Sequence, residues 1–320
     1  MTQHVENNPP AASGLGLHNM IKAKTPHIGF YYETPLYYEA SKGIGFEVYK
    51  PPFVTINDMR IKNDRLPSTL YIHTKDKLTG LKEIQKALNV QLECDLRTNN
   101  PSHVKSTLIG LVDETIKDPC EGGIAGAVGT MEIVFSEYLK NRSVIDNLIN
   151  VMSKDYTTAV HSVNVMALTL RFCMFCKMKE RESKKLGLSA LLHDVGKLKI
   201  SNKILKADRR LTESEYELMK KHTTFGYEIL KSCNLPEDIN LCALSHHERA
   251  DGSGYPNGAI DITHEAEIIG FIDCYEALTC NDRPYRDAVK PFDALTHIKK
   301  ELNRGNFKFK VYERFVKSLG

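Results

Sequence analysis

The stretch Leu186–Lys197 reads LGLSALLHDVGK, an apolar run that ends in an adjacent histidine and aspartate. Its composition predicts a buried helix that ends near Gly196. Burying titratable side chains at such a helix end is costly unless a cation or a hydrogen-bond partner meets them. His193 and Asp194 are therefore candidate ligands that reach a common centre from a helix terminus.

A second histidine lies on an amphipathic pattern, in LTESEYELMKKHTTFGYEIL. Thr212 and Glu215 have the spacing of a capping box, which predicts where this helix begins. The positions that follow one helical stripe are Leu218, His222, Phe225 and Ile229. We therefore expect the imidazole of His222 to point into the protein.

Three other segments combine apolar periodicity with a titratable residue. His161 begins the helix that continues to Cys173, and His246-His247 ends the helix of PEDINLCALSHHE. Asp273 shares a helical face with apolar residues, namely Ala266, Ile269 and Ala277. An unpaired carboxylate on such a face would cost several kcal/mol, so Asp273 also needs a partner.

These candidates number seven and come from five helices: His161, His193, Asp194, His222, His246, His247 and Asp273. A single inward histidine is usually a core residue satisfied by hydrogen bonds. Five histidines and two aspartates together are difficult to satisfy in a core without metal. Mixed imidazole and carboxylate ligands suit iron, manganese or zinc, and a shared carboxylate suits a two-metal site.

The length and composition of the chain indicate what kind of protein contains this site. The chain has 320 residues with 42% apolar and 26% charged residues, which predicts folded structure in two domains. A net charge of +3 is too small to indicate a nucleic-acid polymer as partner. We find neither an apolar run of about 18 residues nor a signal sequence, so we expect a cytoplasmic protein with reduced thiols and no membrane insertion.

The composition and the hydrophobic pattern of the chain change along its length. We expect a flexible arm over residues 1–25, rich in Asn, Pro, Ala and Ser, and a small α/β or β-barrel-like accessory domain over 26–100. Residues 101–320 are predicted to be helical, with a break over Pro119–Gly129. The Cys173/Cys176 pair lies in an apolar helical pattern without a second such pair, so core packing is favoured over a zinc site. The fold is thus predicted to be mainly α.

Three blocks of this sequence resemble a known family. His193-Asp194-Val195-Gly196-Lys197 is similar to the HD signature of metal-dependent phosphohydrolases. The segments HHERADGSGYPNG (246–258) and FIDCYEALTCNDRPYR (271–286) resemble the GYP signature and the segment that follows it. Over about residues 147–320 the chain resembles HD-GYP domains, which are cyclic di-GMP phosphodiesterases. Residues before this region only loosely resemble accessory domains, and a packing module without a ligand is an equal alternative.

The resemblance implies a binuclear centre. One metal would be held by His161, His193, Asp194 and Asp273, and Asp194 would bridge to a second held by His222, His246 and His247. Iron is preferred and manganese is the alternative. A metal-activated hydroxide would attack the phosphorus of cyclic di-GMP and the ribose 3′ oxygen would leave, giving pGpG, with further hydrolysis to GMP left open. Asp194 and Lys197 are the candidate catalytic residues; the alternative for Lys197 is a solvated lysine at a helix end.

Candidate substrate contacts surround these ligands. Arg283 and Arg286 flank Pro284-Tyr285, where both guanidinium groups could reach phosphate. Lys197 would also contact the substrate. Gly254 and Tyr255 lie in the loop after His247, where glycine allows a close approach of backbone amides, although a surface turn without function is the alternative.

The sequence departs from the family's pattern at two positions, and two other functions are alternatives to cyclic di-GMP hydrolysis. Some family members have a Glu four residues before the first histidine that binds a third metal, whereas this chain has Thr157, which predicts two metals. The family's usual His-Pro is His222-Thr223 here, and we expect no effect on the ligand. The rivals are hydrolysis of another cyclic dinucleotide and a catalytically idle effector that acts through a partner protein. A homodimer and signalling partners are compatible with the resemblance.

Overall fold

The computed structural model describes residues 19–23, 25–41, 45–56, 66–98, 100–141, 143–151, 157–280 and 288–320. Its chain divides into two compact units, Met1–Ala87 and Leu88–Gly320. Helix α2 (Lys77–Arg97) runs through this division, whereas the domain boundary predicted from sequence lies near residue 100. The predicted arm falls mostly outside the described residues, although Met20–Lys22 within it forms strand β1.

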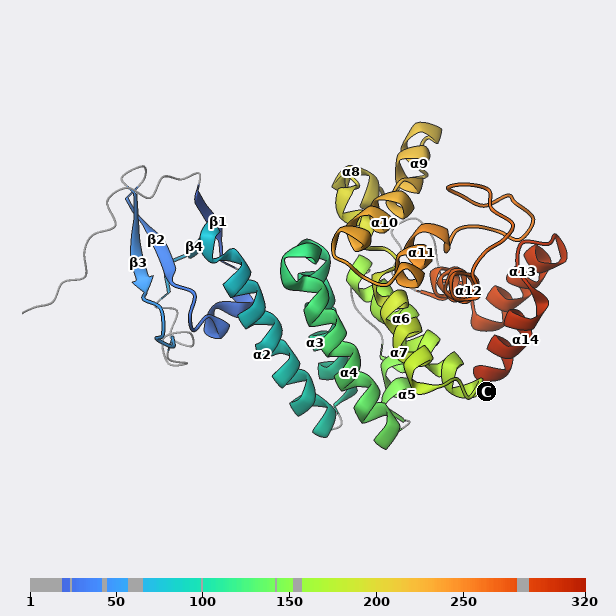
Figure 1. Ribbon diagram of the computed structural model, residues 1–320, viewed down its shortest axis with the longest axis horizontal. Helices are drawn as coiled ribbons and strands as arrows, with labels where there is room; N and C mark the ends of the chain where they lie inside the picture. The colour runs from blue at the N-terminus through green and yellow to red at the C-terminus, as the bar shows by residue number, and fades with distance from the viewer. Residues whose placement is uncertain are drawn as a thin grey trace, which may run out of the picture. The chain divides into compact units, whose positions relative to one another are not determined.

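The first unit holds a four-stranded antiparallel sheet in the order β1-β4-β2-β3 (Figure 1). Its other strands are β2 (Leu36–Ser41), β3 (Gly45–Lys50) and β4 (Tyr71–His73). The Glu83 carboxylate on α2 accepts hydrogen bonds from the backbone N–H groups of Tyr32 at 2.7 Å and Thr34 at 3.1 Å, which attach the helix to the segment before β2. The sheet has two edge strands, so the small α/β alternative is confirmed over the barrel.

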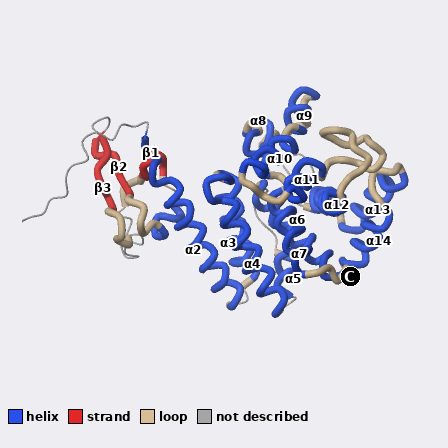
Figure 2. Tube along the Cα trace, viewed as in Figure 1, coloured by secondary structure: helices blue, strands red, loops and turns tan. Residues whose placement is uncertain are grey.

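The second unit is built from helices, and Figure 2 shows strands only in the first unit among the described residues. The leading helices are α3 (Pro101–Lys117), α4 (Ile124–Lys140) and α5 (Ser143–Asn150). The helices that follow are α6 (Thr158–Phe175), α7 (Glu180–Leu192), α8 (Asn202–Leu205), α9 (Glu213–Lys220), α10 (His222–Ser232), α11 (Glu237–Ser245), α12 (His264–Thr279), α13 (Pro291–Asn303) and α14 (Phe309–Ser318). The predicted mainly α fold is confirmed.

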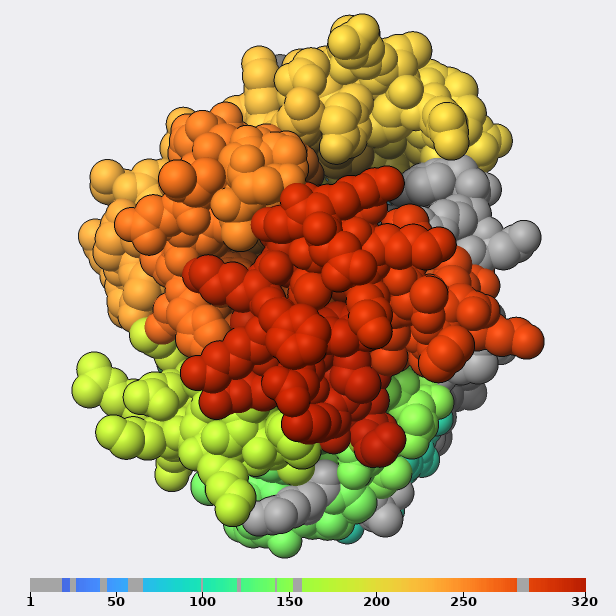
Figure 3. All heavy atoms as spheres, turned by 90° about the vertical axis from the view of Figure 1, so that its right-hand side faces the viewer, coloured from blue at the N-terminus to red at the C-terminus, as the bar shows by residue number. Residues whose placement is uncertain are grey.

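Helix α6 lies at the centre of this unit and packs against α3, α5, α7, α12 and α14. It is long and apolar enough to pass as a membrane span, but 72% of its residues are buried, as in the core helix of a folded domain. Cys173 is buried and free within it, as core packing predicts. Helices α13 and α14 cover one face of the unit, as Figure 3 shows, and Phe315 of α14 packs its ring against Phe271 of α12 at 5.2 Å between centroids.

Three expectations need correction. The predicted helix break is confined to a π-helical turn over Pro119–Gly123, because glycines after it are accommodated inside α4. Leu218 is 46% exposed because the helix is interrupted at Lys221, so α9 and α10 do not share one stripe. Reduced thiols were expected throughout, yet Cys233 is disulfide-bonded.

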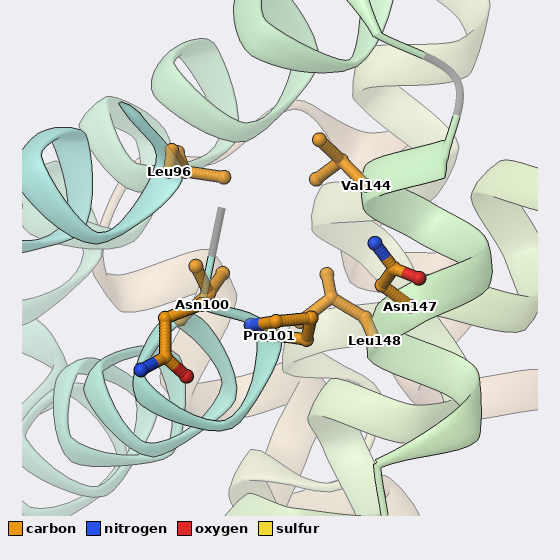
Figure 4. A pocket seen from close by; sticks show the side chains of 7 residues that line it. Leu96, Asn100, Pro101, Val144, Asn147 and Leu148 are labelled. Carbon is orange, nitrogen blue, oxygen red and sulfur yellow. The ribbon is translucent and has the colours of Figure 1, made fainter. Parts of the chain in front are cut away.

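A small pocket is found where the end of α2 and the start of α3 meet α5 (Figure 4). The residues lining it are mostly apolar: Leu96, Asn100, Pro101, Val104, Val144, Asn147 and Leu148. None of the candidate ligands is among them, so this pocket is separate from the candidate metal centre.

Candidate metal centre

The fold brings all seven predicted ligands to one place. His161 lies in the first turn of α6, His193-Asp194 follow α7, and His222 begins α10. His246-His247 follow α11, and Asp273 lies in the third turn of α12. Six of the seven are buried, and His247 is partly exposed. Most of these ligands lie at or just beyond the end of a helix, where a side chain can point away from the helix surface into the core.

Two glycines allow the elements that carry the ligands to approach closely. A Cβ on Gly196 would lie 1.9 Å from the carbonyl oxygen of His222, and a Cβ on Gly270 would lie 2.0 Å from that of His246. Real Cβ atoms do not approach an oxygen so closely, so both positions require glycine. Gly196 therefore serves close packing against α10, in addition to following the end of α7 as predicted.

One cluster of ligand atoms forms around His161, His193 and Asp273, whose donor atoms lie within 4.8 Å of one another. The Nε2 atom of His161 is 3.0 Å from Oδ1 of Asp273 and 3.4 Å from Oδ2 of Asp194. The Nε2 atom of His193 is also 3.4 Å from Oδ2 of Asp194. A single cation in this cluster would meet nitrogen and oxygen donors only.

A second cluster is formed by His222, His246 and His247. The other oxygen of Asp194, Oδ1, lies 3.3 Å from Nε2 of His222 and 3.9 Å from Nε2 of His246. Asp194 thus directs one carboxylate oxygen toward each cluster. This is the arrangement that a carboxylate bridging two cations requires.

Backbone carbonyls set the tautomers of three of the histidines. The Nδ1–H groups of His193, His222 and His246 donate to the carbonyl oxygens of Ala190, Met219 and Ala243, at 2.7, 2.7 and 3.0 Å. A carbonyl oxygen can only accept, so the proton is on Nδ1 and each neutral ring keeps its Nε2 lone pair for a ligand.

The electrostatics keep this lone pair available on His222 and His246, and they act in the opposite sense on His161, whose ring they favour in the protonated form. Burial lowers the pKa of His222 to about 4, and burial together with the neighbouring histidines holds the pKa of His246 well below its usual value. Burial opposes ionisation of Asp194, but the charges of Lys197 and the surrounding histidines outweigh it and lower the pKa of Asp194. For His161, burial is outweighed by the carboxylates of Glu276 and Asp273, which raise its pKa to about 9.

The arrangement fits a bound metal. With both rings neutral and protonated on Nδ1, the Nε2 lone pairs of His222 and His246 face each other at 3.4 Å, a contact that repels unless a cation lies beside it. Nε2 of His193 and Oδ1 of Asp194 are buried without a hydrogen-bond partner among the described residues. These orphaned atoms are the ones that a metal would use.

The GYP segment closes the site on one side. The ring of Tyr255 stacks on that of His247, with 4.6 Å between centroids, and the ammonium of Lys220 lies 5.8 Å from the Tyr255 ring centre. A Cβ on Gly254 would lie 2.4 Å from the backbone of Glu248, so the predicted close approach at this glycine is a contact within the protein. Lys197 makes an ion pair with Asp194, which places its ammonium at the centre. Arg283 and Arg286 lie outside the described residues.

Three residues of the site were missed by sequence reasoning. Glu276 accepts a hydrogen bond from Nδ1 of His161 at 2.6 Å and another from Asn164 at 2.8 Å. Glu248 accepts hydrogen bonds from the backbone N–H groups of Asn257 at 2.8 Å and Ala259 at 2.9 Å, which hold the GYP segment. An acidic residue three positions after Asp273 on an apolar helix was the signal that could have revealed Glu276.

Residues 143–308 match the family model of the HD domain, slightly over half of the chain. The chain belongs to the HD domain family. His193-Asp194, which resemble the HD signature, lie within these matching residues. The predicted HD-type fold is confirmed.

Relatives of this HD domain protein include a cyclic di-GMP phosphodiesterase of Pseudomonas aeruginosa, 31% identical over 61% of this chain and 47% of the relative. A cyclic di-GMP phosphodiesterase of Thermotoga maritima is 34% identical over 59% of this chain and 52% of the relative, and a 3′3′-cGAMP-specific phosphodiesterase of Vibrio cholerae is 32% identical over 52% and 39%. The chain spans about half the length of the curated relatives it matches. An HDG"Y"P protein from Bdellovibrio bacteriovorus has the same fold, with a TM-score of 0.62 at 15% identity over 94% of this chain and 99% of that one.

Proposed function

We propose that this HD domain protein is a binuclear metal-dependent phosphodiesterase that hydrolyses a cyclic dinucleotide, with cyclic di-GMP as its substrate. The observation that carries the proposal is the position of Asp194, whose two carboxylate oxygens face two adjoining clusters, Oδ2 toward His161 and Oδ1 toward His222. A phosphodiester needs both a nucleophilic water and stabilisation of its non-bridging oxygens, and two adjacent cations supply both.

The ligand sets follow from the two clusters. His161, His193, Asp194 and Asp273 would hold the first metal, and Asp194, His222, His246 and His247 would hold the second. His247 is the weakest part of the second set, because its Nδ1 lies 4.0 Å from Oδ2 of Asp273 and its ring also stacks on Tyr255. Nitrogen and oxygen donors without a thiolate favour iron or manganese, of which we prefer iron.

Two divalent cations held by these residues would polarise the phosphate and lower the pKa of a bound water molecule. Asp194 holds the two clusters in one geometry. Lys197 presents an ammonium beside Asp194, where it neutralises the negative charge that builds up on the phosphoryl oxygens. Water adds its oxygen to phosphorus and its proton to the departing ribose 3′ oxygen, so that one P–O bond forms, one breaks and linear pGpG results.

The choice of substrate rests on the relatives. Both cyclic di-GMP and 3′3′-cGAMP phosphodiesterases are among them, so 3′3′-cGAMP is the competing substrate. Tyr255, Gly254, Arg283 and Arg286 stay proposed substrate contacts. The idle-effector alternative is less well supported, because every ligand of both clusters is present.

The decisive experiment is anaerobic purification of the full chain, elemental analysis, and product identification by mass spectrometry after incubation with cyclic di-GMP or 3′3′-cGAMP. We expect close to two transition metals per chain and pGpG from cyclic di-GMP. Thr157 is engaged as the N-cap of α6, where its hydroxyl accepts from Val160 N–H at 3.2 Å, so no third metal is expected. A chain that is loaded with both metals but forms no product from either nucleotide would contradict the enzymatic proposal in favour of the effector.

Four further expectations stay predictions: the homodimer, the signalling partners, the regulatory role of residues 26–100 and the cytoplasmic location. Size-exclusion chromatography with light scattering tests the first of them.

A further inference from the structure

His161 differs from three of the other candidate histidine ligands in the acceptor to which its Nδ1–H group donates a hydrogen bond. His193, His222 and His246 each donate from Nδ1 to a backbone carbonyl three residues earlier. His161 donates instead to the carboxylate Oε2 of Glu276 at 2.6 Å, across 115 residues of sequence. An anion is a stronger acceptor than a carbonyl, so the ring of His161 becomes a stronger electron donor through its Nε2 atom.

Glu276 is held on both of its oxygens. Its Oε1 atom accepts a hydrogen bond from Nδ2 of Asn164 at 2.8 Å, and its residue is only 3% exposed. Asn164 follows His161 by three positions on α6, and Glu276 follows Asp273 by three positions on α12. One turn of each helix therefore carries a candidate ligand and the next turn carries the group that orients it.

This carboxylate adds negative charge beside the first cluster. The first cluster already contains Asp194 and Asp273, whereas the second combines three histidines with Asp194, and Asp273 approaches it at 4.0 Å from Nδ1 of His247. A buried anion next to the first cluster favours a divalent cation there by direct attraction, in addition to its effect through the His161 ring.

We propose that Glu276 is a positioning residue that orients His161 and strengthens the first metal site. The inference rests on the metal centre of the proposed function.

Manganese affinity of the full chain, measured by competition with a chelator, tests the role of Glu276. Glu276→Gln removes the charge with little change of shape, and we expect the affinity of one of two manganese ions to fall by about 10–100-fold. The matched control is Glu267→Gln on the same helix, because Glu267 is equally buried but pairs with Lys308 at 3.1 Å. Glu276→Asp keeps the charge and should recover part of the loss, which a merely structural defect would not.

Unchanged manganese affinity in Glu276→Gln would overturn the inference while leaving the metal centre intact. A wild-type chain that binds no manganese would overturn the proposed centre itself, and this inference with it.

Discussion

Gly270 packs directly on the main-chain carbonyl of His246, so closely that an added Cβ would lie 2.0 Å from the oxygen. Gly196 stands in the same relation to the carbonyl of His222 at 1.9 Å. In both pairs the carbonyl belongs to a candidate ligand, and the glycine is two or three residues from another, Asp194 or Asp273. Close helix packing is therefore a condition for the metal centre, because it sets the distances between ligands that lie far apart in sequence.

Replacing Gly270 tests this condition. Gly270→Ala must push α12 away from α11, and we expect a loss of about 1–3 kcal/mol in the free energy of unfolding together with reduced metal content. The control is Gly129→Ala on α4, where the new Cβ would meet Asn89 at an ordinary 3.6 Å and should stabilise the helix by about 0.5–1 kcal/mol. Urea unfolding and elemental analysis measure both quantities. A Gly270→Ala chain with wild-type metal content would show that the centre tolerates the displacement.

Glu248 is expected to act on the loop without binding metal. Glu248→Gln replaces one carboxylate oxygen with an NH2 group that cannot accept, so one of the backbone N–H groups of Asn257 and Ala259 loses its partner and the GYP segment should lose its position. We expect KM for cyclic di-GMP to rise about tenfold, as a loss of about 1.4 kcal/mol implies, with unchanged metal content. Steady-state kinetics measure the change, and Glu237→Gln on the exposed start of α11 is the control. A fall in metal content would assign Glu248 to the centre instead.

Lys197 is expected to act on the transition state. Lys197→Ala removes the ammonium that pairs with Asp194, and turnover should fall by about 10²–10³-fold with little change in KM. Lys199→Ala, two residues later and paired with Glu228 at 3.6 Å, should be neutral. Arg286→Ala should mainly raise KM if that residue binds phosphate. Equal changes of KM and kcat in Lys197→Ala would contradict its assignment.

The capping box of α9 predicts a pH-dependent contribution to stability. A hydrogen bond from Arg209, with others from Thr212, lowers the pKa of Glu215 from 4.5 to about 2. Because the folded-state pKa is the lower one, the stabilisation is complete above pH 4.5 and is lost as the pH falls through 2. Glu215→Gln should therefore lower the urea midpoint at pH 7 more than at pH 3. The same shift at both pH values would show that ionisation of Glu215 does not stabilise the helix.

The local sequence pattern was sufficient to predict much of the fold. The capping box of Thr212 and Glu215 forms as predicted, and His161 and Asp273 face inward as their helical periodicity indicates. These predictions succeed because a helix places residues three and four apart on one face, whatever surrounds it. The prediction fails at Leu218, since the interruption at Lys221 leaves no clear pattern in the sequence.

Sequence alone determined that this chain has helices carrying histidines and aspartates on their buried faces and ends, because those features depend on neighbouring residues. Only the tertiary structure decided which oxygen of Asp194 faces which cluster, and that Glu276 meets the ring of His161 from 115 residues away. Such relations arise from the packing of helices against one another, and no periodicity within a single helix encodes the partner that another helix brings.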